Sequence, residues 1–352
     1  MNRKLHRFFR RRHTQDSEIE LAAQEGYLAL LVLDREVLPA KRRYTMAELA
    51  AKSGTDLSTA QSLWRAVGFP DLPEELPGFT DDDVKAMKSF IETLTASGIG
   101  EIDLDSSLTI ARVLGSSLAT AADAVSESVA DRFRLARDAG VSDEELASVI
   151  AGQSQLPQLA EMVDHIFRLQ LRAAFWRRLA LVDTDHSGSI PGSIGFVDLV
   201  GFTALSEEID EEELGGLVRR FNDMAYDTVA SANGRVVKTI GDAVMFVAHT
   251  PEITADIATQ ITARSLSDPA LPRARAGIAE GELVVRQGDY FGPVVNLASR
   301  LTDMARPGTV LAPTAMGEQL ANGGRFDVHR LGRRRVRDIG RIDICSIKSL
   351  PA

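Results

Sequence analysis

Asp198 is the first residue whose setting indicates chemistry. It follows an apolar, strand-like run in the segment SIGFVDLVGFT. A carboxylate in that setting is costly unless it binds a cation or several hydrogen-bond donors. The next residues, Gly201, Phe202 and Thr203, offer a glycine and backbone N–H groups that could approach phosphate oxygens. A helix is expected from about Asp210, so this strand end is a candidate phosphate or cation site.

A second carboxylate, Asp242, lies in GRVVKTIGDAVMFV, where two apolar strands flank Gly241-Asp242. This dipeptide predicts a two-residue hairpin, and turn formation alone would explain the aspartate. Two carboxylates at strand ends nevertheless fit two hard cations on a triphosphate, because Mg²⁺ binds one or two carboxylates together with substrate oxygens. Lys238 lies in the same apolar run, where an unpaired ammonium would be costly.

A third segment, GDYFGPVVNLASRLTDMARPGTVL, predicts a helix with two polar side chains on one face. Pro293 suits the first turn of this helix, and Asn296 and Arg300 are four residues apart. These two side chains are either surface groups or a clamp for sugar and phosphate. The sequence contains neither the P-loop motif nor the paired-glycine dinucleotide motif, so a nucleotide site would be of another kind.

The elements that position these residues fall into two halves with different sequence patterns. Residues 17–182 show helical periodicity, whereas residues 194–352 alternate short β-branched strands with amphipathic helices. The Gly/Ser/Pro-rich residues 183–193 between them predict a linker. We therefore expect an all-α domain followed by an α/β domain, as the length of 352 residues allows.

The linker also begins like a calcium-binding loop. Asp183, Asp185 and Ser187 occupy the first three ligand positions of such a loop, and Gly188 its turn. The twelfth position, which needs a glutamate, is Ile194. Calcium binding is therefore disfavoured.

The overall charge and the N-terminus limit the partners. A formal net charge of −10 disfavours a surface built to hold nucleic acid. With no secretory signal, no run of about 18 apolar residues and Cys345 as the only cysteine, we expect a cytoplasmic protein. Residues 1–16 are strongly basic and predict a disordered tail that could contact an anionic membrane or a partner.

Within the helical half, residues 42–71 have the outline of a helix-turn-helix with its turn at Gly54. This segment resembles the start of the winged helix-turn-helix domains of bacterial regulators. The second helix offers only Gln61 and Arg65 for base edges and phosphates, so we favour a packing role and expect no nucleic-acid partner.

Residues 157–182 predict one long helix with an apolar stripe and an arginine-rich face. Such a helix, ending at the linker, could transmit a change from the first domain to the second, or it could simply pack against the helical domain. His165 within it is a candidate proton switch, although a single helical histidine is more often structural.

Taken together, FVDLVGFT, VKTIGDAVM, GDYFGPVVNLASR and ARPGTVL resemble, in order and spacing, the catalytic domain of class III nucleotide cyclases. The helical half resembles the N-terminal regulatory domain of soluble bacterial adenylate cyclases that include pH-responsive members. The resemblance implies a ferredoxin-like βαββαβ core preceded by an all-α regulatory domain. It also implies a head-to-tail homodimer with shared active sites.

The resemblance assigns roles to the candidate residues. Asp198 and Asp242 match the aspartates that bind two Mg²⁺ or Mn²⁺ ions per active site. Lys238 and Asp289 match the pair that recognises adenine, which favours ATP because guanine presents a carbonyl where adenine presents an amine.

The resemblance extends to the ribose and the phosphates. Asn296 matches the residue that orients the ribose, and Arg300 the one that stabilises charge on the α-phosphate. Arg337 occupies the place of a basic residue that reaches the triphosphate. Asp338 stands where many members have glycine, so this contact could instead come from Arg334, Arg335 or Arg341.

The expected activity is conversion of ATP to 3′,5′-cyclic AMP and pyrophosphate, controlled by the helical domain. A guanylate cyclase and a nucleotide-sensing, DNA-binding regulator are the alternatives. The resemblance further implies inhibition that is relieved at acidic pH, and the effector would be a proton or a small molecule bound by the helical domain.

Overall fold

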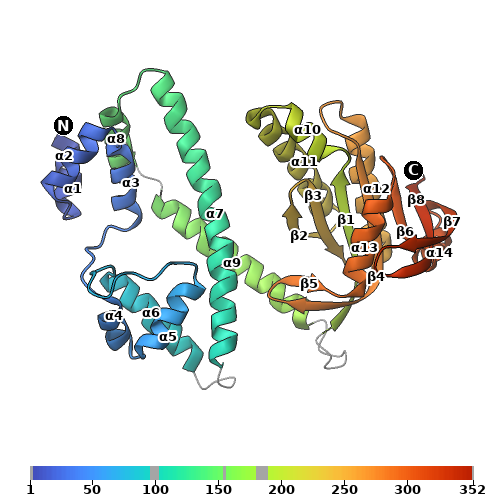
Figure 1. Cartoon of the computed structure of the whole chain (residues 1–352), viewed down its shortest axis with the longest axis horizontal. Coiled ribbons are helices and arrows are strands. Elements are labelled where there is room, and N and C mark those ends of the chain that lie inside the picture. Colours follow the sequence, from blue (N-terminus) through green and yellow to red (C-terminus); the bar gives the residue numbers. More distant parts are fainter. Residues whose placement is uncertain (1–2, 96–102, 154–155, 180–188, 351–352) are drawn as a thin grey trace. The chain divides into compact units, whose positions relative to one another are not determined.

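The computed structural model describes residues 3–95, 103–153, 156–179 and 189–350. The chain divides into two compact units, Met1–Arg177 and Arg178–Ala352. The described part of the first unit is helical, and the second unit combines a sheet with helices (Figure 1). The calcium-like positions Asp183 to Gly188 lie outside the described residues. Ile194, the twelfth position of that loop, is a buried strand residue.

The helices of the first unit form two small hydrophobic cores. One core joins the first three helices to the eighth, and the other joins the fourth, fifth and sixth. The helices are α1 (Arg3–Arg11), α2 (Asp16–Glu25), α3 (Leu28–Val37), α4 (Met46–Ser53), α5 (Leu57–Ala66), α6 (Asp81–Thr95), α7 (Leu104–Asp138), α8 (Asp143–Gln153) and α9 (Leu156–Leu179).

The N-terminal segment corrects a sequence prediction. Residues 1–16 were expected to be a disordered tail, but Arg3–Arg11 form α1. Leu5, Phe8 and Phe9 recur at helical spacing and are buried against α3 and α8. The basic side chains of α1 remain exposed on its other face, so apolar burial orders a segment whose composition is mostly basic.

Helices α4 and α5 form the predicted helix pair. Gly54 ends α4 in the left-handed conformation, which glycine adopts at little cost. Asp56 caps α5 by accepting a hydrogen bond of 2.9 Å from the Thr59 backbone N–H. Arg65 is held by Asp71 through bonds of 2.5 to 3.0 Å. This arginine is therefore neutralised by an acidic neighbour.

Helix α9 agrees with the predicted long helix as far as Leu179, while residues 180–182 lie outside the described part of the chain. Its apolar stripe is exposed among the described residues. Met162, Ile166, Leu169 and Trp176 are each about half exposed or more. His165 also lies at the surface of this helix. The packing expected along the stripe is therefore not made by these described side chains.

Helix α7 is long and apolar enough to cross a membrane by length and composition alone, with a mean hydropathy of 1.2 over its most apolar window. The sequence analysis expected no run of about 18 consecutive apolar residues, and α7 contains none, because serines and charged side chains interrupt it. A single helix of this kind is weak evidence for a membrane span, because the long helices of many proteins pass the same test.

The second unit is built on one sheet in the order β2-β3-β1-β4-β6-β8-β7, with β5 paired to β4. All neighbouring strands are antiparallel except β4 and β6. The strands are β1 (Ser189–Leu199), β2 (Arg235–Ile240), β3 (Ala243–Ala248), β4 (Ala274–Arg286), β5 (Asp289–Phe291), β6 (Val310–Pro313), β7 (Phe326–Val336) and β8 (Gly340–Ser349).

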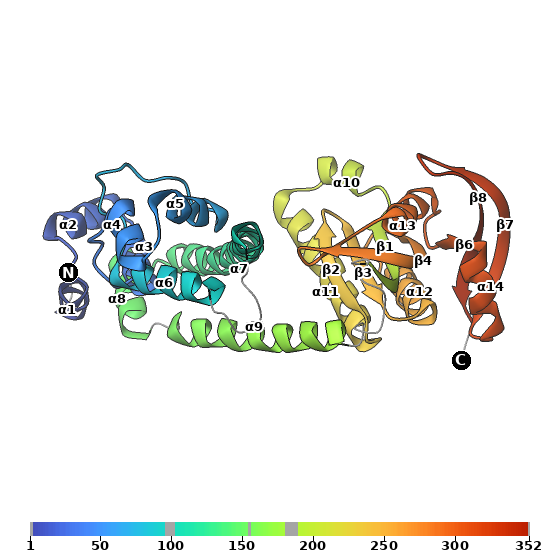
Figure 2. The same ribbon diagram turned by 90° about the horizontal axis from the view of Figure 1, so that it is seen from below.

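Helices cover both faces of this sheet (Figure 2). One face carries the main core with three helices, and the other carries a smaller core beneath α13. The helices are α10 (Phe202–Glu208), α11 (Glu211–Ser231), α12 (Pro251–Ser267), α13 (Pro293–Met304) and α14 (Thr314–Asn322). The order β2-β3-β1-β4, with α11 and α12 as the connecting helices, confirms the predicted ferredoxin-like βαββαβ core.

The start of β1 corrects the predicted linker. Residues 183–193 were expected to be a linker, yet Ser189 to Ser193 already pair with β4. Strand β1 pairs with β3 only from Ser193 onward, so Pro191 lies at an open strand edge where its missing N–H is tolerated. The Gly/Ser/Pro composition therefore concealed the first residues of a strand.

Candidate active site

Strand pairing brings Asp198 and Asp242 together. Asp198 lies near the end of β1, opposite Ala243 at the start of β3. Asp242 immediately precedes Ala243 in the predicted turn with Gly241, which joins β2 to β3. The β1–β3 register therefore places the two carboxyl groups near each other at one edge of the sheet. The sequence predicted both strand ends, and the sheet places them side by side.

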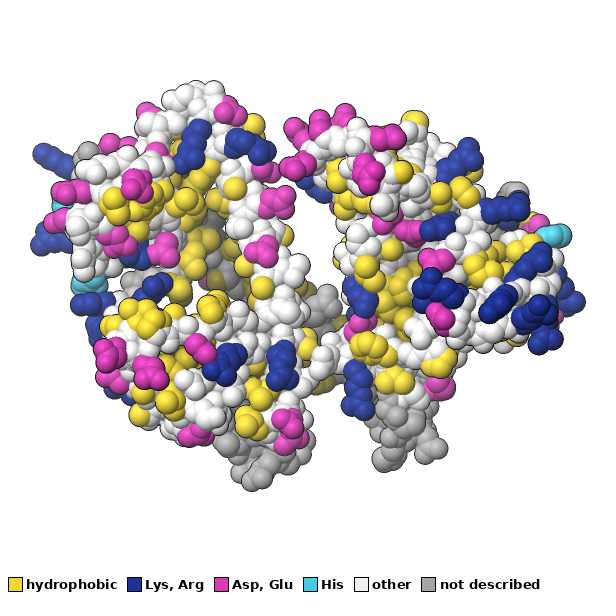
Figure 3. Space-filling model, in the orientation of Figure 1, with side chains coloured by type: hydrophobic (Ala, Val, Ile, Leu, Met, Phe, Trp, Pro, Cys, Tyr) yellow, Lys and Arg dark blue, Asp and Glu magenta, His cyan; other side chains and the backbone are white. Residues whose placement is uncertain are grey.

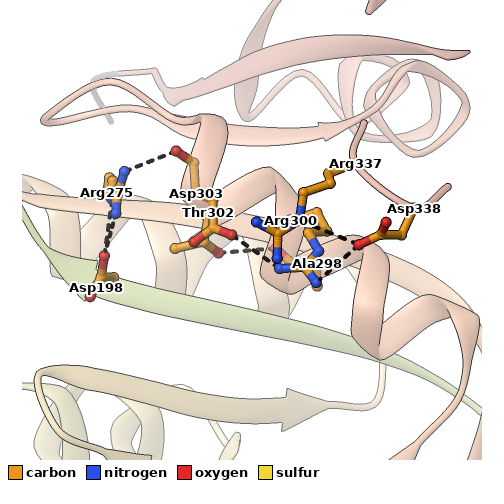
Figure 4. Close-up of polar contacts among 8 residues, drawn as sticks. All are labelled: Asp198, Arg275, Ala298, Arg300, Thr302, Asp303, Arg337 and Asp338. Carbon is orange, nitrogen blue, oxygen red and sulfur yellow. Dashed lines mark hydrogen bonds and ion pairs between the residues drawn. The ribbon is translucent and has the colours of Figure 1, made fainter. Parts of the chain in front are cut away.

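Arg275 is a site residue that the sequence analysis missed. It lies on β4 directly opposite Asp198. Its Nε and Nη2 donate to Asp198 Oδ2 at 3.0 and 2.7 Å, and its Nη1 donates to the Asp303 carbonyl at 2.9 Å (Figure 4). One guanidinium therefore fixes the Asp198 carboxylate and ties β4 to the end of α13. No local motif marks it, because the contact depends on the register of β1 against β4.

The electrostatics of the carboxylate pair suit a divalent cation. Burial, followed by the negative charge of Asp198, raises the pKa of Asp242 to about 6. Within the described residues no third His, Cys, Asp or Glu completes a metal cluster. A cation held here would take its remaining ligands from substrate oxygens and water, as Mg²⁺ commonly does.

Lys238 and Asp289 form an ion pair between β2 and the start of β5. A β-bulge between Val236 and Lys238 shifts the register of β2 against β3, which re-aims the side chains of the bulged strand. Asp289 is oriented further, because its Oδ1 accepts a hydrogen bond of 2.8 Å from the Tyr290 backbone N–H. The lysine that appeared costly in an apolar run thus has its partner.

Helix α13 begins at Pro293 as predicted and carries Asn296 and Arg300 four residues apart. Asn296 is exposed. Arg300 is half-buried and lies 3.5 Å from one carboxylate oxygen of Asp303 and 3.5 Å from one of Asp338 (Figure 4). The C-terminal turn of α13 lies beside the Asp198 end of β1, because Arg275 bonds both to Asp198 and to the Asp303 carbonyl, whereas Asn296 lies nearly two turns earlier in the helix.

Arg337 lies at the tip of the β7–β8 hairpin and is exposed. Its Nε is 3.3 Å from Asp338 Oδ2. Basic side chains gather over this hairpin (Figure 3). Its other arginines, including the alternatives for the triphosphate contact, are Arg330, Arg333, Arg334, Arg335 and Arg341.

The segment after Asp198 forms a turn and a short helix. Gly201 adopts a φ of 78° and immediately precedes α10. Phe202 packs against the main core, while Gly201 and Thr203 are exposed. Because Gly201 is left-handed, the chain turns directly after β1. This turn is exposed and follows Asp198 by a few residues.

Three apolar side chains near these groups are exposed. Ile240 lies beside the Asp242 turn, Phe291 follows the Asp289 strand, and Ile339 lies at the β7–β8 tip, with exposures of 53%, 50% and 39%. Exposed apolar side chains around a polar site are typical of a surface that another molecule covers.

The sheet order, together with a carboxylate pair and a Lys–Asp pair at one sheet, defines the catalytic domain of a class III nucleotide cyclase. Comparison with known proteins supports this assignment. Residues 188–267 match the adenylate and guanylate cyclase catalytic domain, and residues 13–175 match the adenylate cyclase regulatory domain.

Curated relatives cover most of the chain. An adenylate cyclase of Streptomyces coelicolor is 35% identical over 82% of this chain and 75% of its own. An adenylate cyclase of Streptomyces griseus is 33% identical over 83% and 72%. A pH-sensitive adenylate cyclase of Mycobacterium tuberculosis is 32% identical over 88% and 79%. The chain belongs to this adenylate cyclase family and carries its regulatory and catalytic domains.

Proposed function

We propose that this adenylate cyclase converts ATP to 3′,5′-cyclic AMP where Asp198 and Asp242 meet. The placement of these two carboxylates side by side by the β1–β3 register carries the proposal, since such a pair suits cations that hold a triphosphate. In the reaction the ribose 3′-hydroxyl loses its proton to solvent, and its oxygen bonds to the α-phosphorus. The bond from that phosphorus to the β-phosphate oxygen breaks, and pyrophosphate leaves.

Asp198 and Asp242 would hold two Mg²⁺ or Mn²⁺ ions, which when bound lower the pKa of the 3′-hydroxyl and offset charge on the phosphates. The pKa of Asp242, about 6, leaves this carboxyl largely ionised at neutral pH, which is the form that would bind a cation. Arg275 keeps the Asp198 carboxylate in one orientation, which reduces the reorganisation needed when the cation arrives.

Lys238 and Asp289 would select adenine. The ammonium donates to a ring nitrogen, and the carboxylate accepts from the exocyclic amine. Guanine presents a carbonyl to that carboxylate, so the pair disfavours GTP and with it the guanylate cyclase alternative. The ion pair holds both groups ready for the base.

The sugar and the phosphates would be bound by the remaining groups. Asn296 orients the ribose, and Arg300 offsets charge that develops on the α-phosphate, where one positioned donor is typically worth about 3 to 4 kcal/mol. Arg337 reaches the distal phosphates. The backbone at Gly201, Phe202 and Thr203 supplies N–H groups to phosphate oxygens.

We further propose a homodimer in which each active site takes residues from both chains. The metal carboxylates would come from one protomer, and the adenine pair with Asn296 and Arg300 from the other. The exposed Ile240, Phe291 and Ile339 beside these groups support a covering partner. Each dimer would then contain two equivalent sites, and the monomer would be inactive.

The helical unit would control this assembly. We propose residues 17–182 together with α1 as the regulatory domain, residues 183–188 as its connection and residues 189–352 as the catalytic domain, since Ser189 already belongs to β1. The pH-sensitive relative supports a proton as effector, with His165 on α9 as a candidate group. A small molecule bound by the helical unit is the second candidate.

The exposed basic face of α1 could contact an anionic membrane.

The test is product formation by the full chain with Mg²⁺ and with Mn²⁺. Cyclic AMP from ATP should greatly exceed cyclic GMP from GTP, and Asp198→Asn should abolish both while the protein remains folded by circular dichroism. A fully active Asp198→Asn protein would contradict the site. Activity–pH profiles of the full chain and of residues 190–352 test the regulation, since identical profiles would contradict control by protons.

A further inference from the structure

Asp338 lies at the tip of the β7–β8 hairpin, in a backbone conformation that suits aspartate. Its φ is 62°, a left-handed backbone that L residues other than Asn and Asp rarely adopt. The neighbouring Gly340 also has a positive φ, of 112°, so the tip is a tight turn. The side chain of Asp338 is 71% exposed, and packing therefore does not explain the carboxylate.

The contacts of Asp338 join two arginines from different elements. Its Oδ2 lies 3.3 Å from Arg337 Nε and 3.5 Å from Arg300 Nη2 (Figure 4). Arg337 follows β7, whereas Arg300 projects from α13. Asp338 is the only carboxylate with a described ion pair to both of these side chains.

Arg300 and Arg337 are also the two arginines proposed to contact the phosphates of ATP. A single carboxylate oxygen shared by two guanidinium groups has the charge and hydrogen-bonding capacity of a phosphate oxygen. In the nucleotide-free protein this oxygen keeps both arginines facing one point. When a triphosphate binds, the same donors must turn to its oxygens while the negative charge of Asp338 remains beside it.

We propose that Asp338 is an internal counter-ion that competes with the triphosphate for Arg300 and Arg337 and so weakens ATP binding. This inference rests on the proposed phosphate-binding roles of the two arginines. It makes Asp338 a positioning residue: it holds the arginines in place before substrate arrives and raises the ATP concentration at which the enzyme works.

The expected effect is modest, because all three side chains reach solvent and exposed ion pairs contribute little. Removing the charge should lower the KM for ATP about two- to fivefold. The kcat should change less than the KM, because Arg300 remains available in the transition state. The shift should shrink in high salt, since salt screens exposed charges.

The test uses Asp338→Asn in the full chain, because asparagine tolerates the left-handed backbone and removes only the charge. Asp327→Asn is the matched control: Asp327 is an exposed aspartate of β7 opposite Lys348, at the far end of the same hairpin. The KM and kcat for ATP are measured at low and high salt. The affinity for inorganic tripolyphosphate is measured by calorimetry.

The proposal predicts a lower KM and tighter tripolyphosphate binding in Asp338→Asn, strongest at low salt, and neither change in Asp327→Asn. Equal values in wild type and Asp338→Asn would overturn it, and so would equal shifts in both variants. Arg300→Ala separates this outcome from a failure of the proposed site. If Arg300→Ala is inactive while Asp338→Asn is unchanged, only the counter-ion role is wrong. If Arg300→Ala is fully active, the assigned phosphate site itself is wrong.

Discussion

Lys238 on β2 and Asp289 at the start of β5 form an ion pair although 51 residues separate them in the sequence. The pair lies at the surface of the catalytic unit, with 41% of the lysine side chain and 25% of the aspartate side chain exposed. A purely structural ion pair so open to solvent would contribute little stability. We therefore propose that its role is to present one donor and one acceptor to a base.

Lys238→Gln should therefore reduce selectivity for ATP. The change removes a charged donor, and a hydrogen bond to a charged group is typically worth about 1.5 to 3 kcal/mol. We expect the ratio of kcat/KM for ATP to that for GTP to fall at least tenfold, with the melting temperature nearly unchanged. Lys348→Gln, an exposed lysine on β8, is the control. An unchanged ratio in Lys238→Gln would assign base recognition to other residues.

The Asp198–Asp242 pair predicts that the stability of the metal-free protein depends on pH. The pKa of Asp242 is raised from its ordinary value of 3.8 to about 6. Between these two pH values the Asp242 carboxyl of the folded protein holds a proton that the unfolded chain has lost. The free energy of unfolding should therefore fall as the pH rises from about 4 to about 6. With EDTA present, Asp242→Asn should remove this slope and gain roughly 1 kcal/mol at pH 7, after allowance for solvent screening.

Thermal unfolding of wild type and Asp242→Asn between pH 4 and 7 measures this effect. Added Mn²⁺ should stabilise wild type more than Asp242→Asn, because only wild type retains both carboxylates. Parallel stability curves for the two proteins, with and without the cation, would show that the carboxylates do not interact as described.

At Gly277 on β4, a single added methyl group is expected to disturb the site. A Cβ there would lie 2.3 Å from the Ala298 carbonyl oxygen and 2.3 Å from the Thr302 backbone N. Helix α13 would have to move away from the sheet and carry Arg300 with it. Gly277→Ala should cost roughly 1 to 3 kcal/mol of stability, as overpacking typically does, and lower kcat at least tenfold.

Gly216→Ala is the control for Gly277→Ala. Gly216 lies in α11 with open space around it, and alanine there should stabilise the helix by about 0.5 to 1 kcal/mol. Denaturant unfolding and initial rates measure both variants. If Gly277→Ala behaves like Gly216→Ala, close packing of α13 on β4 does not position Arg300.

Local signals in the sequence predicted much of this site. Gly241-Asp242 marked the hairpin, and Pro293 marked the start of α13. Asp210 caps α11 by accepting a hydrogen bond of 2.9 Å from the Glu213 backbone N–H. Each of these features depends on residues a few positions apart. Their structure therefore follows from local backbone preferences.

The features that the sequence did not predict depend on tertiary contacts. The Arg275–Asp198 pair joins residues 77 positions apart and follows from strand register alone. The pairing of Ser189 with Val284 turned a predicted linker into a strand. In α1, buried Phe9 outweighs the basic composition that predicted a tail. Composition describes average solubility, whereas burial is decided by the partner surface.

The most direct test of the whole account mixes two inactive variants. Asp242→Ala lacks one of the proposed metal carboxylates, and Asn296→Ala lacks the proposed ribose contact. If each site takes these residues from different chains, a mixed dimer contains one intact site. Random assortment of equal amounts should then restore roughly a quarter of wild-type cyclic AMP formation. If the mixture stays as inactive as either variant alone, although exchange of subunits is demonstrated, the shared-site account is contradicted.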